Sequence, residues 1–199
     1  MLKKPKFKIA RRLGAGVYDK AQTPKFAASQ KGSFTGRRPK APTEYGAQLL
    51  EKQKVRFSYG ITERQLANYV KKAAHIKGAG TVSKLFEGLE SRLDNVVYRL
   101  GLAPSRRAAR QMASHGHFTV NGRRVTVPSY ALKAGDLIQV RVGSQGKKIF
   151  ENLPERLKEY NAPAWLSWDV EKMEGRVAGK PENTETFLDL NAVLEFYSR

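Results

Sequence analysis

The stretch from Ser91 to Val142 constrains the fold more than any other part of the chain, because it predicts two short helices, a β-hairpin and a closing strand. Ser105 is well placed to cap the second helix. Gly116 can adopt the left-handed conformation that ends many helices. Asn121-Gly122 suits the two positive-φ positions of a type I′ turn. We therefore expect a small αα-plus-β-hairpin module.

The basic residues of this module are predicted to lie away from its packed face. Arg92 and Arg99 are seven residues apart, and Arg106 and Arg110 are four apart, so each pair shares a side of its helix. The apolar stripe of the first helix has the spacing of a single helical face and consists of Leu93, Val96, Val97 and Leu100. One face of the helix pair should pack, and the other should be charged.

Alternating apolar residues predict the strands of the module. Phe118 and Val120 mark the first strand, and Val125 and Val127 mark its return. After the turn at Gly135-Asp136, a further strand is predicted by the alternation of Ile138, Val140 and Val142.

These residues resemble the S4 RNA-binding domain. The resemblance is carried by Arg92-Leu93-Asp94, Arg106, Arg110, His115, Val120-Asn121-Gly122 and Gly135-Asp136. Because this domain also occurs in pseudouridine synthases, some tyrosyl-tRNA synthetases and a ribosome-associated heat-shock protein, it identifies no single protein.

The residues around the module extend the resemblance over essentially the whole chain. Ordered blocks are similar to the ribosomal protein S4 family: Pro5-Lys6, Arg11-Arg12, Tyr45-Gly46, Gln48-Leu49, Glu51 to Arg56, Tyr59-Gly60, Glu63-Arg64-Gln65, Pro163, Trp165-Leu166, Lys172 to Gly175, Lys180-Pro181-Glu182 and Glu195 to Arg199. Two family features are missing: a zinc-binding cysteine cluster, and a Pro-Gly-Gln-His-Gly-like turn, whose nearest equivalent is Ser29 to Gly32. The chain is thus similar to the cysteine-free form of the family.

The resemblance implies a structural protein of the small ribosomal subunit. Such a protein binds small-subunit ribosomal RNA directly and early in assembly, clamps a junction of RNA helices and contributes to decoding accuracy. The implied partners are neighbouring small-subunit ribosomal proteins, notably S5, and in some bacteria messenger RNA. The implied location is the cytoplasm, and no enzymatic activity or cofactor is implied.

The charge distribution independently indicates a polyanionic partner. The chain carries 37 Lys and Arg against 18 Asp and Glu, a formal net charge of +19. The net charge is +12 in residues 1–60, +9 in residues 61–144 and −2 in residues 145–199. Nucleic acid is therefore expected to meet the first two thirds of the chain.

Several other classes of protein fit the sequence poorly. The absence of cysteine excludes disulfides and thiolate metal sites. Three histidines, His75, His115 and His117, are too few to support a metal site. No segment offers the roughly 18 uninterrupted apolar residues of a membrane-spanning helix. The basic N-terminus also fits an organellar transit peptide, but the family-like block begins at Pro5, so we expect no removable leader.

The predicted fold class is α+β, with the small module inserted into a mainly helical domain. The interpretation divides the chain into a basic irregular N-terminal arm (1–43), the first part of the helical domain (44–90), the RNA-binding module (91–153) and a C-terminal segment that packs back on the helical domain (154–199). Thr62 is a predicted helix cap. Phe187 to Tyr197 has helical spacing and should pack on the N-terminal helices.

The candidate RNA contacts are the basic residues of the arm, the helical domain and the module. Arginine forks bind phosphates bidentately, and lysines act as mobile point charges. The candidates are Lys3, Lys4, Lys6, Lys8, Arg11, Arg12, Arg37, Arg38, Lys52, Lys54, Arg56, Arg64, Arg92, Arg99, Arg106, Arg107, Arg110, His115, Arg123 and Arg124.

Two alternatives remain open on the residues alone. One is an RNA-modifying enzyme or ribosome-associated factor that carries the same module, although no aspartate lies in a separate sheet-rich domain of the kind that uridine isomerisation needs. The other is a helix-turn-helix DNA regulator with Ser105 to His115 as its recognition helix, although the basic charge is spread more widely than a major-groove reader needs.

Overall fold

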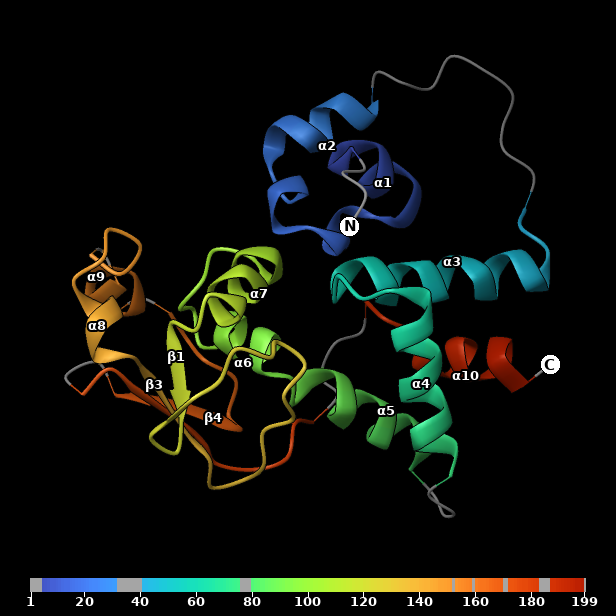
Figure 1. Ribbon diagram of the computed structural model, residues 1–199. Coiled ribbons are helices and arrows are strands. Elements are labelled where there is room, and N and C mark those ends of the chain that lie inside the picture. Colours follow the sequence, from blue (N-terminus) through green and yellow to red (C-terminus); the bar gives the residue numbers. More distant parts are fainter. Residues whose placement is uncertain are drawn as a thin grey trace. The chain divides into compact units, whose positions relative to one another are not determined.

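The computed structural model describes residues 5–31, 41–75, 80–151, 153–158, 160–169, 172–182 and 187–198. The chain divides into two compact units (Figure 1). The helical unit comprises Met1–Val82 and Thr184–Arg199, and the mixed unit comprises Ser83–Asn183. Helices and an antiparallel sheet together confirm the predicted α+β class.

The helical unit is built from segments at both ends of the chain. Its α-helices are α1 (Lys6–Leu13), α2 (Pro24–Lys31), α3 (Glu44–Ser58), α4 (Glu63–Ala74) and α10 (Leu190–Ser198), with 3₁₀ turns η1 (Ala15–Val17) and η2 (Asp19–Ala21). Two of these helices begin at threonine caps. The Thr43 side chain accepts a hydrogen bond from the Gly46 amide, and Thr62 forms a capping box with Gln65, as the sequence predicted for Thr62.

The C-terminal helix α10 packs on α3, which confirms the prediction for this segment. Gln48 of α3 donates a hydrogen bond to Glu195 at 3.1 Å. The rings of Tyr45 and Phe196 lie 5.5 Å apart, and Val193 is fully buried. Apolar burial and ring contact thus join two segments whose contacting residues, such as Gln48 and Glu195, are 147 positions apart in the sequence.

The N-terminal arm corrects a prediction, because residues 5–31 form helices and 3₁₀ turns and not an irregular segment. Ala10, Ala21 and Phe26 form a small buried cluster that holds these turns together. Gly14 and Gly16 lie against the ring of Phe187, where an added Cβ would come within 3.2 and 3.0 Å of the ring. Local apolar contacts, and not only the expected RNA partner, therefore order this part.

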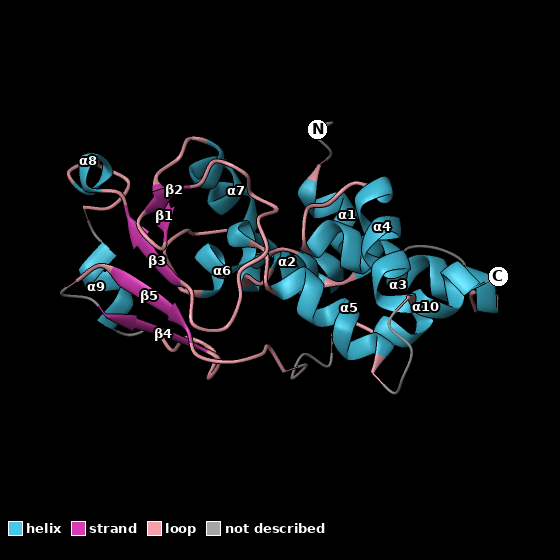
Figure 2. Ribbon diagram, turned by 60° about the horizontal axis from the view of Figure 1, so that its bottom comes forward, coloured by secondary structure: helices cyan, strands magenta, loops and turns pink. Residues whose placement is uncertain are grey.

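The mixed unit combines helices with one five-stranded sheet (Figure 2). The sheet order is β2-β1-β3-β5-β4, and the strand pairs are antiparallel. The strands are β1 (Phe118–Val120), β2 (Arg123–Arg124), β3 (Leu137–Val140), β4 (Leu166–Asp169) and β5 (Glu174–Val177). The helices are α5 (Thr81–Glu90, entering from the helical unit), α6 (Leu93–Arg99), α7 (Arg106–Ser114), α8 (Val142–Gln145) and α9 (Leu153–Lys158).

One hydrophobic core joins α6, α7, α9 and the sheet. Its buried side chains include Leu93, Val97, Phe118, Ile138 and Leu153. The predicted apolar stripe of α6 is therefore confirmed. The two tryptophans, Trp165 and Trp168, are partly buried against this core and so anchor this part of the chain.

The strand predictions are confirmed in part. Asn121 and Gly122 have φ values of 50° and 78°, as a type I′ turn requires. The return strand is Arg123–Arg124 and not Val125 to Val127, and Val127 is exposed. Strand β3 ends at Val140, so Val142 is not its continuation. In both β2 and β3, apolar and polar residues still alternate in the sequence beyond the last residue that pairs with β1, so the pattern predicted longer strands than the pairing allows.

A second correction concerns β4 and β5, which the sequence interpretation missed. It placed residues 154–199 with the helical domain, but β5 pairs with β3 and extends the sheet of the mixed unit. The alternation in Leu166–Asp169 and Glu174–Val177 is too short to stand out from its polar surroundings. The three boundaries between the four predicted segments otherwise stay a prediction.

Two general features limit the classes of site. Among the described residues, no helix has the length and apolar character needed to cross a membrane. The same residues contain no group of three or more His, Asp or Glu side chains arranged to hold a metal ion.

Candidate nucleic-acid interface

Helix α7 carries Arg106 and Arg110 beside its packed face, where both are partly buried. The Ser105 side chain accepts a hydrogen bond from the Ala108 amide at 3.3 Å, which confirms the predicted cap and starts the helix. Ala109 is fully buried in the core. Helical spacing then places Arg106 and Arg110 together on another side of α7.

Glu90 and Asp94 contact both these arginines and the arginines of α6. Glu90, the last residue of α5, has a side chain that is only 1% exposed. Arg99 donates from Nε and Nη2 to the two Glu90 oxygens, at 2.9 Å each. The Asn95 amide donates to the same carboxylate at 2.9 Å. The Glu90 carboxylate therefore accepts bonds from two side chains of α6.

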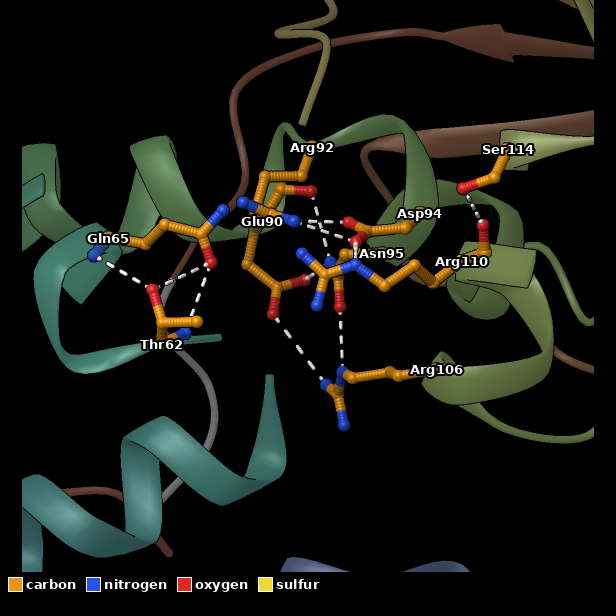
Figure 3. Close-up of polar contacts among 9 residues, drawn as sticks. All are labelled: Thr62, Gln65, Glu90, Arg92, Asp94, Asn95, Arg106, Arg110 and Ser114. Atoms are coloured by element: carbon orange, nitrogen blue, oxygen red, sulfur yellow. Dashed lines mark hydrogen bonds and ion pairs between the residues drawn. The ribbon is translucent and has the colours of Figure 1, made fainter. Parts of the chain in front are cut away.

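Asp94, in the first turn of α6, forms the second centre (Figure 3). Arg92 donates to its two oxygens from Nε at 2.9 Å and from Nη2 at 2.7 Å. Arg110 of α7 reaches the same carboxylate, with Nε 3.5 Å from Oδ2. The Asp94 carboxylate thereby links α6 to α7.

Arg106 is held from three sides. Its Nε donates to the Asn95 side-chain oxygen at 2.8 Å, and its Nη2 lies 3.9 Å from Glu90 Oε1. Its guanidinium carbon lies 4.6 Å from the centre of the Tyr98 ring, a cation–π contact. Asn95 therefore bridges Glu90 and Arg106, since it donates a hydrogen bond to Glu90 and accepts one from Arg106 (Figure 3).

We call this cluster the arginine network: Glu90, Arg92, Asp94, Asn95, Arg99, Arg106 and Arg110. Four guanidinium groups face two carboxylates, so the network carries two excess positive charges. Buried charges are tolerated only when they are paired and hydrogen-bonded, and the two carboxylates meet that condition. The side chains of Arg106 and Arg110 remain 18% and 25% exposed. The excess positive charge is therefore partly exposed at Arg106 and Arg110 of α7 and at Arg99 of α6, whose side chain is 19% exposed.

The position of Arg92 corrects the predicted charged face. Its side chain is 1% exposed and is paired with Asp94, which is also buried. Arg92 is the N-cap residue of α6 and has an extended backbone, so the helical spacing that was expected to place it beside Arg99 does not apply to it. Arg92 therefore organises the network from within, and a direct phosphate contact by its side chain is not available in this structure.

Four further candidate residues of the mixed unit are exposed: Arg107, His115, Arg123 and Arg124. Arg124 of the hairpin donates to the backbone carbonyl of His115 at 3.2 Å. Its guanidinium lies over Gly116, whose φ of 69° ends α7 as predicted. The hairpin and the end of α7 thus form one basic surface.

His117 points into the protein behind this surface. Its Nδ1 and the Ser144 hydroxyl lie 2.9 Å apart. Burial lowers the pKa of His117, and the nearby positive charges of Lys147 and His115 lower it further. His117 is therefore a neutral core residue, while its sequence neighbour His115 is exposed.

In the helical unit, α3 and α4 are joined by a second ion-paired group. Lys52 Nζ lies 2.8 Å from Glu63, and Arg56 lies 3.3 Å from the same carboxylate. The Tyr197 hydroxyl donates to Glu63 at 2.7 Å. Burial raises the pKa of Glu63, but the hydrogen bonds from Lys52 and Tyr197 and the charges of Lys52 and Arg56 outweigh it, so the pKa is lowered. Burial and Glu63 both raise the pKa of Tyr197.

Other candidate cations of this unit differ in exposure. Lys54 pairs with Glu51 and lies over the Phe187 ring, whereas Arg64 is exposed. On α1, Lys8, Arg11 and Arg12 are exposed and Lys6 is half-buried. A groove of about 560 Å³ lies between α1 and α3, and its lining combines the cations Lys8, Arg12 and Arg56 with apolar residues of both helices.

The remaining candidates, Lys3, Lys4, Arg37 and Arg38, lie outside the described residues. The structure also reveals residues that sequence reasoning missed. Glu90 and Asn95 were given no role, because an acid and an amide do not stand out in a search for phosphate-binding cations. The available signal was the alternation of acidic and basic residues across Glu90, Arg92 and Asp94.

Comparisons with known proteins match nearly the whole chain. Residues 1–90 match the family model described as the ribosomal protein S4/S9 N-terminal domain, and residues 91–138 match that of the S4 domain. The chain is 43% identical over 203 residues to the small ribosomal subunit protein uS4 of a Roseiflexus species, covering 98% of this chain and 97% of the relative. The uS4 protein of Thermus thermophilus is 43% identical over 205 residues, covering 98% and 97%. The uS4c protein of Rhodomonas salina is 47% identical over 166 residues, covering 82% of each.

Proposed function

The chain belongs to the uS4 family of small-subunit ribosomal proteins, a structural and non-enzymatic family, and from this membership we propose that it binds small-subunit ribosomal RNA directly. The observation that carries the proposal is the arginine network, whose two excess positive charges reach the surface at Arg106 and Arg110 within the matched S4 domain. Phosphate is the ligand that such paired guanidinium groups favour.

The physical basis is recognition of RNA by its backbone. An RNA duplex has a deep, narrow major groove that side chains read poorly, so contacts go mainly to phosphates and 2′-hydroxyls. Exposed cations suit this task. In the mixed unit these are Arg107, His115, Arg123 and Arg124, next to the partly exposed Arg106 and Arg110.

The helical unit supplies a separate set of cations. Lys8, Arg11, Arg12 and Arg64 are exposed there. Two basic units in one chain support the proposal that the protein contacts more than one RNA helix and clamps a junction. Binding of this kind orders RNA segments relative to one another, which is the physical reason for the proposed action early in assembly.

Finer aspects of the proposal rest on the family alone. They are a contribution to decoding accuracy, contact with the neighbouring ribosomal protein S5, binding of messenger RNA in some bacteria and a cytoplasmic location within the small subunit. An RNA-modifying activity is not supported, because the relatives over nearly the whole chain are structural ribosomal proteins.

The direct test is binding of the full chain to small-subunit ribosomal RNA, with transfer RNA and duplex DNA of matched length as competitors. We expect saturable binding that prefers ribosomal RNA at 0.15 M salt, and a steep loss of affinity with rising salt because counterions are released from each contacted phosphate. Equal affinity for the three nucleic acids would contradict the proposal and leave only a basic protein.

A further inference from the structure

The charges around Glu90 pose a physical problem. A surface that binds a polyanion gains from every positive charge and loses from every negative one. The chain nevertheless places two acidic side chains, Glu90 and Asp94, 3.9 and 3.5 Å from the guanidinium groups of Arg106 and Arg110. Coulomb attraction to RNA does not by itself explain why these two acidic residues lie there.

Their geometry gives a reason. The Arg106 and Arg110 side chains are long, and an unrestrained arginine loses conformational freedom when a phosphate immobilises it. Here the Nε of each arginine already has a partner within the protein. Arg106 donates to Asn95, which in turn donates to Glu90, and the Nε of Arg110 lies 3.5 Å from Asp94. The side chains are thus arranged before any RNA arrives.

We propose that Glu90 and Asp94 are positioning residues, which hold Arg106 and Arg110 as a preformed pair for a backbone phosphate of the bound RNA. The inference rests on the proposed function, because it names how one part of that RNA-binding surface achieves its affinity. The negative charges reduce the attraction to RNA, but they lower the entropy lost on binding, since fewer rotamers remain to be frozen.

The arrangement also accounts for the other two arginines. Arg92 and Arg99 each bind a carboxylate with two hydrogen bonds and so offset its charge. Arg92 does so from inside the protein, whereas the Arg99 side chain is 19% exposed. Arg106 and Arg110 lie 3.9 and 3.5 Å from the same carboxylates and bring the network to two excess positive charges. The network has the composition expected of a support for a phosphate site.

The substitution Glu90→Gln distinguishes a positioning role from simple Coulomb attraction, because these two explanations predict opposite changes in RNA affinity. Removal of a negative charge should tighten RNA binding if only Coulomb attraction matters. Loss of positioning should weaken it, by about tenfold at 0.15 M salt, and reduce the salt slope by about one phosphate contact. The assay is a salt titration of the full chain with small-subunit ribosomal RNA.

Glu87→Gln is the matched control. Glu87 lies three residues earlier on the same helix, and its carboxylate pairs with Lys84 at 2.9 Å and not with the network. This variant removes the same charge without disturbing Arg106 or Arg110. We expect its affinity to be unchanged within about twofold or slightly higher, as the polyelectrolyte effect alone requires.

A second measurement keeps the test decisive if Glu90→Gln does not fold. In the wild-type protein without RNA, ¹⁵N relaxation of the arginine Nε groups should show Arg106 and Arg110 as ordered and the exposed Arg107 as mobile. Equal mobility of the three, or an equal or tighter RNA affinity of a folded Glu90→Gln variant, would overturn the inference. Failure of the wild-type chain to prefer ribosomal RNA would instead count against the proposed function, while the relaxation data would still decide the positioning.

Discussion

The guanidinium of Arg92 and the carboxylate of Asp94 form two hydrogen bonds, at 2.9 and 2.7 Å, with both side chains buried. These residues are two apart in the sequence, and Arg92 precedes the helix that Asp94 helps to begin. The pair therefore fixes the start of α6 and, through Arg110, the position of α7.

We predict that Asp94→Ala destabilises the mixed unit by about 3–5 kcal/mol, because Arg92 would keep a buried charge without its main partner. Urea unfolding of the full chain, followed by near-UV circular dichroism, measures the change. The double variant Arg92→Met/Asp94→Leu removes both charges and should recover most of the loss. A single variant that unfolds at the wild-type urea concentration would show that the ion pair is dispensable.

The end of α7 allows backbone strain to be separated from steric overlap. Gly116 has a φ of 69°, and an added Cβ would overlap the Arg124 guanidinium. Gly122 has a φ of 78°, but open space surrounds the position of its Cβ. We expect Gly122→Ala to cost about 1–2 kcal/mol from strain alone. Gly116→Ala should cost more, because Arg124 must also move.

Thermal unfolding of the two glycine variants measures this difference. Gly146→Ala serves as a control, since Gly146 has a negative φ of −75° and open space around it. Equal melting temperatures for Gly116→Ala and Gly122→Ala would show that Arg124 moves away without cost.

The helical unit should lose stability in acid through Glu63. Its folded pKa lies below the ordinary value of 4.5, so the unfolded chain takes up the proton first as the pH falls. The stabilisation is thus fully present above about pH 4.5 and is lost as the pH falls through the lower, folded pKa. Glu63→Gln should therefore unfold at lower urea concentration than the wild type at pH 7, with the gap narrowing below pH 4.5.

A matched variant for this prediction is Glu195→Gln, which changes an exposed carboxylate of the same unit that bonds to Gln48. Its unfolding midpoint should depend on pH much as the wild type does. A pH-independent gap between Glu63→Gln and the wild type would mean that Glu63 acts only through the Tyr197 hydrogen bond and not through its charge.

Replacement of both α7 arginines by lysine, Arg106→Lys/Arg110→Lys, should weaken ribosomal RNA binding on the order of fivefold to tenfold, although the net charge stays the same. Lysine lacks the planar fork that bonds Asn95 or Asp94 on one side and a phosphate on the other. Filter binding at constant salt measures the effect, and Arg107→Lys shows how much one arginine-to-lysine change costs at an exposed position of the same helix outside the network. Wild-type affinity of the double variant would mean that only charge matters at this surface.

Much of the architecture could be predicted because it depends on local chemistry. The caps at Thr62 and Ser105 and the turn at Asn121-Gly122 depend on backbone groups within a few residues, and the apolar stripe of α6 depends on helical spacing alone. The basic character of the first two thirds of the chain is likewise a property of composition.

Tertiary structure decided which arginines remain available to a ligand. Arg92 and Arg106 look alike in the sequence, but one is buried against Asp94 and the other lies at the surface above Glu90 and Asn95. The pairing of β5 with β3 also joins residues that are more than 30 positions apart. Burial and long-range pairing depend on how separate elements pack. The α+β class and the basic, RNA-binding character could therefore be predicted from local patterns and composition, whereas the members of the proposed phosphate-binding surface depend on packing.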